Sequence, residues 1–385
     1  MSLLIVRKLG GRGEGVRLFR RQARINLALQ GGGAHGAFTW GVLDRLLEDE
    51  DLKICWISAT SAGAVNAVAL ASGLLAGDRR AARAKLRSVW EAVHKAGVPD
   101  LLRLNPFLYG LSRTPQLAHV ASLWSPYEFN PLGFDPLRRL LTDAIDFAKL
   151  RAGSPVELLI AATEVSSGRA RIFRGEEITV DAVLASACLP MLHHAVEIDG
   201  VAYWDGGFSA NPDLRTLAME SPVEDTLIVQ INPLVRHGLP TGVREISLHA
   251  NRLAFNAPLV RDVELIETVR ECSKRWLGGA RGHYGRLATH RFHLIEAGRY
   301  TGALSPDSTL KPDWTLLNYL FSAGRDEAEK WLSLHRRSLG HRSSVNLKAR
   351  FLTPERPRGA LASVGKRAAA DSPHKLAAAG SDIPD

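Results

Sequence analysis

The sequence predicts an α/β fold with a mostly parallel sheet. Short apolar runs rich in β-branched residues alternate with longer segments of helical period, which is typical of parallel strands connected by helices. The chain has 385 residues, enough for one large domain or two ordinary ones. Its 45% of apolar residues can form a core, and its 23% of charged residues is the share found in soluble proteins.

Five elements are predicted in the first hundred residues. In chain order they are a strand over 25–30, a helix over 37–48, a strand over 53–60, a helix over 62–75 and a helix over 81–95. The fourth is apolar almost all round, so we expect it to be a buried helix.

The pattern changes at residue 99. Residues 99–134 combine prolines with aromatic residues in no clear period. Asp135 and Pro136 form an N-cap and N1 pair that opens a helix to about residue 147. A buried strand over 156–163, a hairpin arm over 168–175 and a short helix over 181–188 follow.

The stretch "VEIDGVAYWDGG" predicts two strands joined by a type I′ turn at Asp199 and Gly200. Another apolar strand is predicted over 226–232. Residues 236–334 are predicted to form a mainly helical extension packed on the core, with one strand around 292–295. From residue 335 the composition turns to Ala, Gly, Pro, Ser and Arg, which predicts a disordered tail over 335–385.

The net charge of +9 is concentrated at the two ends of the chain. Residues 1–24 contain seven Lys or Arg and one acid, and residues 335–385 contain ten and four, so the stretch between them carries −3. We expect these basic ends either to attract anionic lipid, giving peripheral membrane contact, or simply to be solvated. Because no finger spacing or aromatic RNA-binding signature accompanies them, no nucleic-acid partner is expected.

Three cysteines, Cys55, Cys188 and Cys272, are too few and too scattered for a disulfide framework or a metal knuckle. We expect all three to be core-like thiols in a reducing compartment. No stretch reaches the ~18 to 20 apolar residues of a membrane span. No secretory signal is expected, because no long apolar region follows Arg7 and Lys8. A cytoplasmic location is therefore expected, and no metal or cofactor motif is seen.

A glycine-rich loop, Gly31-Gly32-Gly33-Ala34-His35-Gly36, follows the first predicted strand. It matches G-x-G-x-x-G, so one interpretation is a dinucleotide site of an oxidoreductase. That site needs an acidic residue at the end of the second strand. Asp51 has a suitable spacing, but it precedes the second strand, which argues against this interpretation.

The second strand leads instead into Ala59-Thr60-Ser61-Ala62-Gly63. This is a near match to the G-x-S-x-G nucleophile elbow, in which small residues two positions either side of the serine let strand and helix approach. The alternative is that Ser61 only caps a helix.

The partner that would activate Ser61 is not an obvious histidine. His193 and His194 are adjacent and would point to opposite faces of a strand. Asp205 is the better candidate, because it ends a predicted strand and is followed by Gly206 and Gly207 in an open, tight turn. An ordinary turn aspartate is the alternative.

Taken in order, the glycine loop, the Ser61 elbow and the Asp205-Gly206-Gly207 turn resemble the patatin-like phospholipase family. The stretches "NPLGFDPLRRLL" and "ASACLPMLHHAVEIDGVAYWDGGFSANP" resemble it too, so the similarity spans about 25–235. The resemblance implies a three-layer α/β/α fold, with the region after 235 similar to an extension found on some bacterial members. The sequence departs from the family pattern at two positions. Ala59 replaces the first glycine of the elbow, and His35 replaces the cationic residue that the loop usually carries. Any charge at His35 would depend on pH, because an unperturbed imidazole titrates near ~6.5.

The resemblance implies a serine lipid acyl hydrolase that cleaves phospholipids or other acyl esters through a Ser61–Asp205 dyad and an acyl-enzyme, without metal or cofactor. To act as the base, Asp205 would be partly desolvated, which raises its pKa. Backbone N–H groups of the glycine loop would form the oxyanion hole. Residues 99–134 would be either a cap over the acyl chain or a loop that covers the core. A non-catalytic scaffold that binds a membrane or partner remains an alternative beside the oxidoreductase. Head group, acyl position, acceptor and oligomeric state are left open by the sequence.

Overall fold

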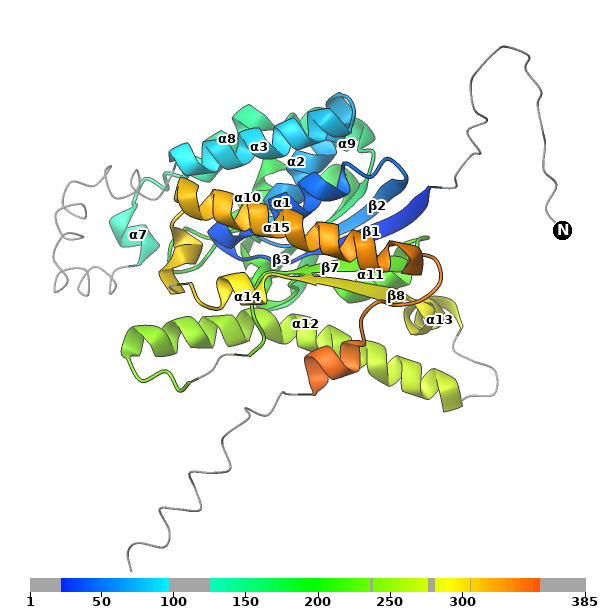
Figure 1. Ribbon diagram of the computed structural model, residues 1–385. Coiled ribbons are helices and arrows are strands. Elements are labelled where there is room, and N and C mark those ends of the chain that lie inside the picture. Colours follow the sequence, from blue (N-terminus) through cyan, green and yellow to red (C-terminus); the bar gives the residue numbers. More distant parts are fainter. Residues whose placement is uncertain (1–21, 97–124, 236–237, 276–280, 305, 354–385) are drawn as a thin grey trace, which may run out of the picture.

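The computed structural model describes residues 22–96, 125–235, 238–275, 281–304 and 306–353 (Figure 1). Most of the proline- and aromatic-rich section 99–134, and most of both basic ends, lie outside these ranges. The strands are β1 (Ala23–Leu29), β2 (Leu52–Ala59), β3 (Glu157–Glu164), β4 (Ala170–Phe173), β5 (Val196–Ile198), β6 (Val201–Asp205), β7 (Asp225–Gln230) and β8 (Arg291–Glu296).

The eight strands found in the described residues belong to one sheet, in which seven follow the order β5-β6-β3-β2-β1-β7-β8 and β4 pairs with β3. The pairs β3–β2, β2–β1, β1–β7 and β7–β8 are parallel, whereas β4, β5 and β6 join in antiparallel fashion. The predicted mostly parallel sheet is therefore confirmed. Its parallel part brings the carboxyl ends of β1 and β2 to the same edge.

Helices cover both faces of the sheet, as a three-layer α/β/α fold requires (Figure 1). One face packs against α1, α2, α3, α8, α9, α10 and α15, and the other against α11, α12 and α13. The longer helices are α1 (Gly36–Leu46), α2 (Ala62–Ala76), α3 (Arg79–Ala96), α8 (Pro136–Ala144), α9 (Phe147–Gly153), α10 (Val180–Ser186), α11 (Leu214–Glu220), α12 (Val243–Arg275), α13 (Gly282–Thr289) and α15 (Trp314–His335). Short turns of helix are α7 (Pro126–Phe129), α14 (Gly298–Thr301), η1 (Gly33–His35), η2 (Gly175–Glu177), η3 (Gly206–Phe208), η4 (Pro306–Leu310), η5 (Arg336–Ser338) and η6 (Lys348–Leu352).

Most predicted elements form within a few residues of their expected bounds. Helix α2 is buried from Ala62 to Gly73, as its all-round apolar sequence predicts. Asp135 caps α8 by accepting from Leu137 N, and Asp199 and Gly200 have the positive φ values (52° and 76°) of a type I′ turn.

One predicted helix is split in two. The segment expected to run to about residue 147 ends at Ala144, and α9 begins at Phe147. The physical reason is a competing cap, because the Asp146 side chain accepts from Lys149 N and so starts a new helix.

The region after residue 235 shares its cores with the region before it. Strand β8 extends the sheet beside β7, and α15 lies along α1 (Figure 1). The two helices cross closely, since a methyl group at Gly41 would stand 2.0 Å from the Phe321 carbonyl oxygen. The extension is therefore part of the same packed body.

The expected start of a disordered tail at residue 335 is wrong, because ordered chain continues to residue 353. Ser344 N donates to Phe292 O of edge strand β8, and Gly340 N donates to Asp225 Oδ1. Leu347 and Phe351 are buried against α12 and the sheet. These apolar contacts are made with residues far away in the sequence, so the local composition did not reveal them.

The cysteines are free but differ in burial: Cys188 is buried, Cys55 is intermediate and Cys272 is exposed on α12. The expectation of three core-like thiols is therefore wrong for Cys272, which lies on the solvent side of its helix. No helix of the described ranges has the length and apolarity needed to cross a membrane.

Candidate active site

The glycine loop and Ser61 meet at the carboxyl edge of the sheet. The loop leaves β1 and Ser61 follows β2, and these parallel strands are direct neighbours, with Leu29 opposite Ala59. A methyl group at Gly31 would stand 2.7 Å from Ser61 Cβ, so only glycine allows the loop to pass this close to the serine.

Ser61 has an unusual backbone conformation, with φ 54° and ψ −123°. Such a conformation strains a residue other than glycine and persists only where its surroundings enforce it. Here Ser61 N donates to Ser186 Oγ at 2.9 Å, and Thr60 Oγ1 donates to Ala210 O at 2.7 Å. Ser61 therefore sits in a sharp strand-to-helix turn at the start of α2.

The small residues on either side of Ser61 fit this turn. A methyl group at Gly63 would stand 2.4 Å from the Leu29 carbonyl oxygen, so this position requires glycine. Ala59 is fully buried at the end of β2 and its methyl group is accommodated in the core. The turn thus forms with alanine at its first position.

Removing the Ser186 hydroxyl should destabilise the protein. In Ser186→Ala the buried Ser61 N–H loses its acceptor, and such a loss costs about 1–3 kcal/mol of unfolding free energy. Equilibrium urea denaturation measures this difference. Ser58→Ala is the matched control, because the Ser58 hydroxyl is buried without a hydrogen-bond partner. Equal stability of both variants would show that Ser186 does not hold the turn.

Asp205 lies at the end of β6, across β3 from the strand that leads to Ser61. Asp205 pairs with Ala162 of β3, and Ile160 of β3 pairs with Ala59 of β2. The Asp205 side chain is fully buried, and its Oδ1 accepts from Gly207 N at 2.7 Å. Its Oδ2 is buried and has no hydrogen-bond partner.

Burial raises the pKa of the Asp205 carboxyl to about 7. The Gly207 N–H and the Ser61 hydroxyl act in the opposite direction and lower this pKa. The Ser61 hydroxyl therefore lies near enough to the carboxyl to influence its pKa, although the two form no hydrogen bond. A carboxylate of this pKa exchanges protons at neutral pH.

The turn after Asp205 is closed, contrary to the expectation of an open turn. A methyl group at Gly206 would stand 2.2 Å from the Ala161 carbonyl oxygen, and one at Gly207 would stand 2.3 Å from the Phe255 ring. Phe255 belongs to α12 and also packs edge-on against Phe208. A helix from the extension therefore excludes water from the carboxylate.

The glycine loop turns into η1, with Gly33 at φ 56°. Gly31 N is already engaged, since it donates to Asn211 Oδ1 at 2.8 Å, so Gly31 is not an available donor for an anion. The N–H groups of Gly33 and Ala34 begin the helical turn and have no partner within it. These groups can bind an anionic oxygen.

His35 is buried, and its Nε2 lies 2.7 Å from Ser308 Oγ. Burial, with a smaller contribution from the nearby positive charge of Arg252, lowers the pKa of His35 to about 4. The expectation that its charge would vary near pH 6.5 is therefore wrong, and the imidazole is neutral at neutral pH. Gly36 approaches Ala62, where a methyl group would stand 2.6 Å from Ala62 Cβ.

The remaining candidates that the sequence suggested lie elsewhere. His193 and His194 lie in a turn after α10 rather than on a strand, and His194 stacks on Tyr127. Asp51 lies immediately before β2, at the opposite end of that strand from the glycine loop. Asp51 therefore does not face the loop as a dinucleotide site requires.

Sequence reasoning missed three residues that shape this site: Ser186, Asn211 and Phe255. Asn211 links the glycine loop to α12, because its Nδ2 also donates to Phe255 O at 2.9 Å. A lone serine in the apolar helix α10 was a signal for Ser186. Nothing local points to Phe255, because it is far from Asp205 along the chain.

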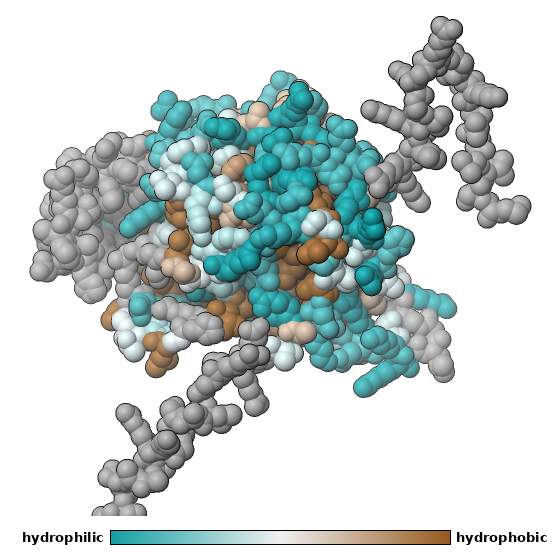
Figure 2. All heavy atoms as spheres, viewed as in Figure 1, coloured by the Kyte–Doolittle hydropathy of each residue, from teal (hydrophilic) through white to brown (hydrophobic). Residues whose placement is uncertain are grey.

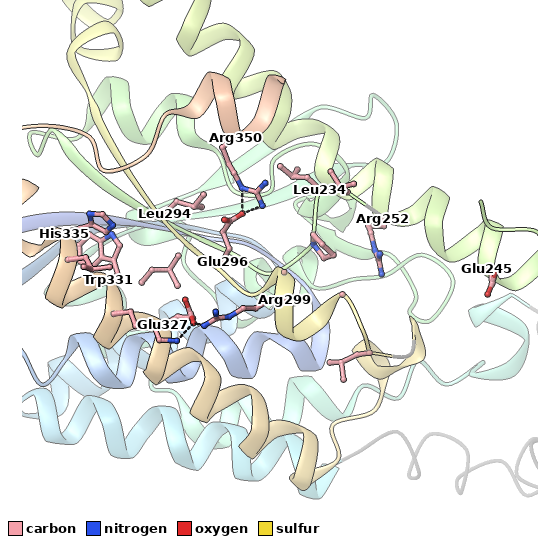
Figure 3. Close-up of a pocket in the computed structure, with 18 residues that line it drawn as sticks. Leu234, Glu245, Arg252, Leu294, Glu296, Arg299, Glu327, Trp331, His335 and Arg350 are labelled. Atoms are coloured by element: carbon pink, nitrogen blue, oxygen red, sulfur yellow. Dashed lines mark hydrogen bonds and ion pairs between the residues drawn. The ribbon is translucent and has the colours of Figure 1, made fainter. Parts of the chain in front are cut away.

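A groove of about 980 Å³ lies along edge strand β8, between α12 and α15 (Figure 3). Its walls carry the ion pairs Glu296–Arg350 and Glu327–Arg299. None of the predicted site residues lines this groove, so it is separate from the Ser61 site. Within the described ranges, no three His, Cys, Asp or Glu side chains group so as to hold a metal ion.

Comparison with known proteins links the chain to one family. The family profile described as patatin-like phospholipase matches residues 27–218. No curated protein matches the sequence significantly.

Solved structures of bacterial proteins are also similar. VipD from Legionella pneumophila is 16% identical with a TM-score of 0.39, over 82% of this chain and 67% of that chain. The type III effector ExoU is 19% identical with a TM-score of 0.30, over 80% of this chain and 52% of the ExoU chain. A chain of the ExoU–SpcU complex from Pseudomonas aeruginosa is 20% identical with a TM-score of 0.28, over 83% of this chain and 61% of that chain. The chain thus spans between about half and two thirds of these solved chains.

Proposed function

Because the chain belongs to the patatin-like phospholipase family, we propose that it is a serine lipid acyl hydrolase of the phospholipase A or lysophospholipase type. The observation that carries the proposal is the place of Ser61, strained at the start of α2, between the glycine loop and a buried Asp205. In this proposal Ser61 and Asp205 work as a dyad.

The first step is attack of Ser61 Oγ on the acyl carbonyl carbon, while Asp205 takes the hydroxyl proton. A base is most effective when its pKa lies near the working pH, and the pKa of Asp205 is about 7. The positive end of the α2 dipole favours the developing alkoxide.

The tetrahedral oxyanion would be held by backbone N–H groups of the glycine loop, those of Gly32, Gly33 and Ala34, together with that of Ala62. Removing one such donor typically raises the barrier by about 2.7–4 kcal/mol. The intermediate collapses when the C–O bond of the ester breaks and the leaving alcohol takes the proton from Asp205.

The acyl-enzyme on Ser61 is then hydrolysed. Asp205 removes a proton from water, the hydroxide attacks the acyl carbon, and the Ser61 oxygen leaves and regains the proton. The products are a free carboxylic acid and the starting enzyme, so protons and bonds balance over the cycle.

The experiment that tests the proposal is mass spectrometry of a lipid panel incubated with purified protein. We expect release of free fatty acid with a matching lysolipid or deacylated product from at least one phospholipid or lysophospholipid class, and none from the Ser61→Ala variant. Failure to cleave any acyl ester, including a soluble short-chain ester, would contradict the proposal.

A neutral His35 predicts that the imidazole contributes no charge to this reaction. In His35→Gln an uncharged side chain can still contact Ser308, so we expect kcat/KM to stay within about tenfold of wild type, or about 1.4 kcal/mol of barrier. The measurement is a pH–rate profile on a soluble ester. Loss of the acid limb of that profile in His35→Gln would show that His35, not Asp205, titrates in the reaction.

A further inference from the structure

Apolar side chains are exposed at one end of the molecule in two groups. The first group, the helix ridge, comprises Leu239, Val243, Ile246 and Leu253, on α12 and the loop before it. The second, the loop cluster, comprises Tyr127, Leu132, Phe134 and Met191. Figure 2 shows apolar side chains gathered over the N-terminal end of α12, at the lower left. Exposed fractions of 76% for Val243 and 94% for Leu132 mean that the core does not use these side chains.

The ridge lies on the face of α12 that points away from the protein. Val243, Ile246 and Leu253 are three and seven positions apart, a spacing that places them on one side of a helix. The side that faces the protein carries Phe255 and Asn256, which pack beside the glycine loop and the turn after Asp205. One helix thus covers the catalytic carboxylate with one face and exposes an apolar stripe on the other.

The loop cluster flanks the site on its other side. Asp205 N donates to Cys188 O at 2.7 Å, and Met191 follows Cys188 by three residues. Tyr127 stacks on His194, and the Leu132 loop reaches the same histidine, because a methyl group at Gly133 would stand 3.6 Å from His194 Nδ1. Asp205 therefore lies between two groups of exposed apolar side chains that come from segments far apart in the sequence.

We propose that the helix ridge and the loop cluster together form the surface by which the protein docks on a phospholipid bilayer, with the Ser61 site held against the lipid between them. The proposal rests on the proposed function. A lipid surface fits both groups at once, because it can contact two separated apolar rims and still supply substrate between them. A protein partner that covered both rims would close the site.

The physical signature of this docking is its resistance to salt. Apolar side chains on a surface helix sink about 5–10 Å into the boundary between head groups and acyl chains. Their contribution depends on area removed from water and is not screened, unlike attraction between exposed charges, which fades beyond a Debye length of about 8–10 Å. Docking by the helix ridge and the loop cluster should therefore persist on zwitterionic vesicles at high salt, where attraction by the basic ends is lost.

The test is co-sedimentation of the full chain with phosphatidylcholine vesicles at low and high salt. Val243→Asp and Leu132→Asp, one on each side of the site, should each lower the vesicle partition coefficient by about tenfold or more, the loss expected for keeping one apolar side chain in water. Leu334→Asp on α15 is the matched control. It introduces the same charge at a side chain with 73% exposure, close to the 76% of Val243, but outside both groups.

A second readout separates this proposal from the proposed function. Hydrolysis of a soluble short-chain ester should be unchanged in all three variants, whereas hydrolysis of vesicle phospholipid should fall in Val243→Asp and Leu132→Asp only. Inactive wild-type protein that still shows the binding pattern would contradict the hydrolase and leave the docking surface supported.

Three results would overturn the docking surface. Both variants could sediment like wild type, or Leu334→Asp could lose binding equally, which would make added charge the cause. Alternatively, the variants could change the elution volume in size-exclusion chromatography without changing vesicle binding. That result would show that the helix ridge and the loop cluster contact a second copy of the chain.

Discussion

Ser61→Ala should lower kcat for a soluble short-chain ester by about 10⁴- to 10⁶-fold, the range seen when a catalytic serine nucleophile is removed. The physical reason is that no acyl-enzyme can form without the Ser61 oxygen. The same variant should lose all labelling by a fluorophosphonate probe, because Ser61 combines a strained strand-to-helix turn with the neighbouring glycine loop. In-gel fluorescence and intact mass spectrometry measure the labelling.

Ser58→Ala is the control for this experiment, since Ser58 lies three positions earlier, on the strand that leads to Ser61, and is also buried. Its activity and its labelling should equal those of wild type. Full labelling of Ser61→Ala, or a probe adduct on another serine of the wild-type protein, would contradict the assignment of the nucleophile.

Asp205→Asn should lower kcat by about 10⁴-fold, a loss comparable to that of other catalytic-aspartate substitutions. An amide occupies the same space and can still accept from Gly207 N, but it cannot take the proton of Ser61. For wild-type protein, kcat/KM should fall as the pH drops below about 7, since the carboxylate becomes protonated at the pKa of Asp205. The residual activity of Asp205→Asn should lack this dependence.

The same substitution should change stability with a definite sign. Burial raises the pKa of Asp205 to about 7 from its ordinary value of 3.8, so between these values the folded state holds a proton that the unfolded state releases. The contribution of this carboxyl to the unfolding free energy of the wild-type protein therefore decreases as the pH rises from about 4 to 7. The amide of the variant does not titrate and carries no such penalty. Thermal denaturation should therefore show that the stability of Asp205→Asn, relative to that of wild type, is greater at pH 8 than at pH 5. A variant that is destabilised equally at both pH values would indicate that the carboxylate is well solvated or firmly paired.

The sequence by itself determined the local elements and their order. Buried strands such as β2 and helices such as α2 follow from apolar patterns, and the Asp199–Gly200 turn follows from the tolerance of these residues for positive φ. The glycine loop and the Ser61 elbow are likewise short local motifs at strand ends, whereas the direct pairing of β1 with β2 that brings them together came from the structure. Each of these inferences depends on residues that are close together in the chain.

Only the tertiary structure decided the environment of the titrating groups. A partly desolvated Asp205 with a raised pKa was expected for a base, but on an open turn. The structure shows that Phe255 of α12 covers that turn and that the carboxylate is fully buried. His35 is neutral because it is buried beside Ser308 and near Arg252. Likewise, residues 338–353 looked like a tail but are ordered by Phe292 and Asp225. In each case the deciding contact joins residues that are far apart along the chain. A pKa depends on the groups that surround the titrating side chain in space. A local sequence pattern does not identify those neighbours when they are distant along the chain.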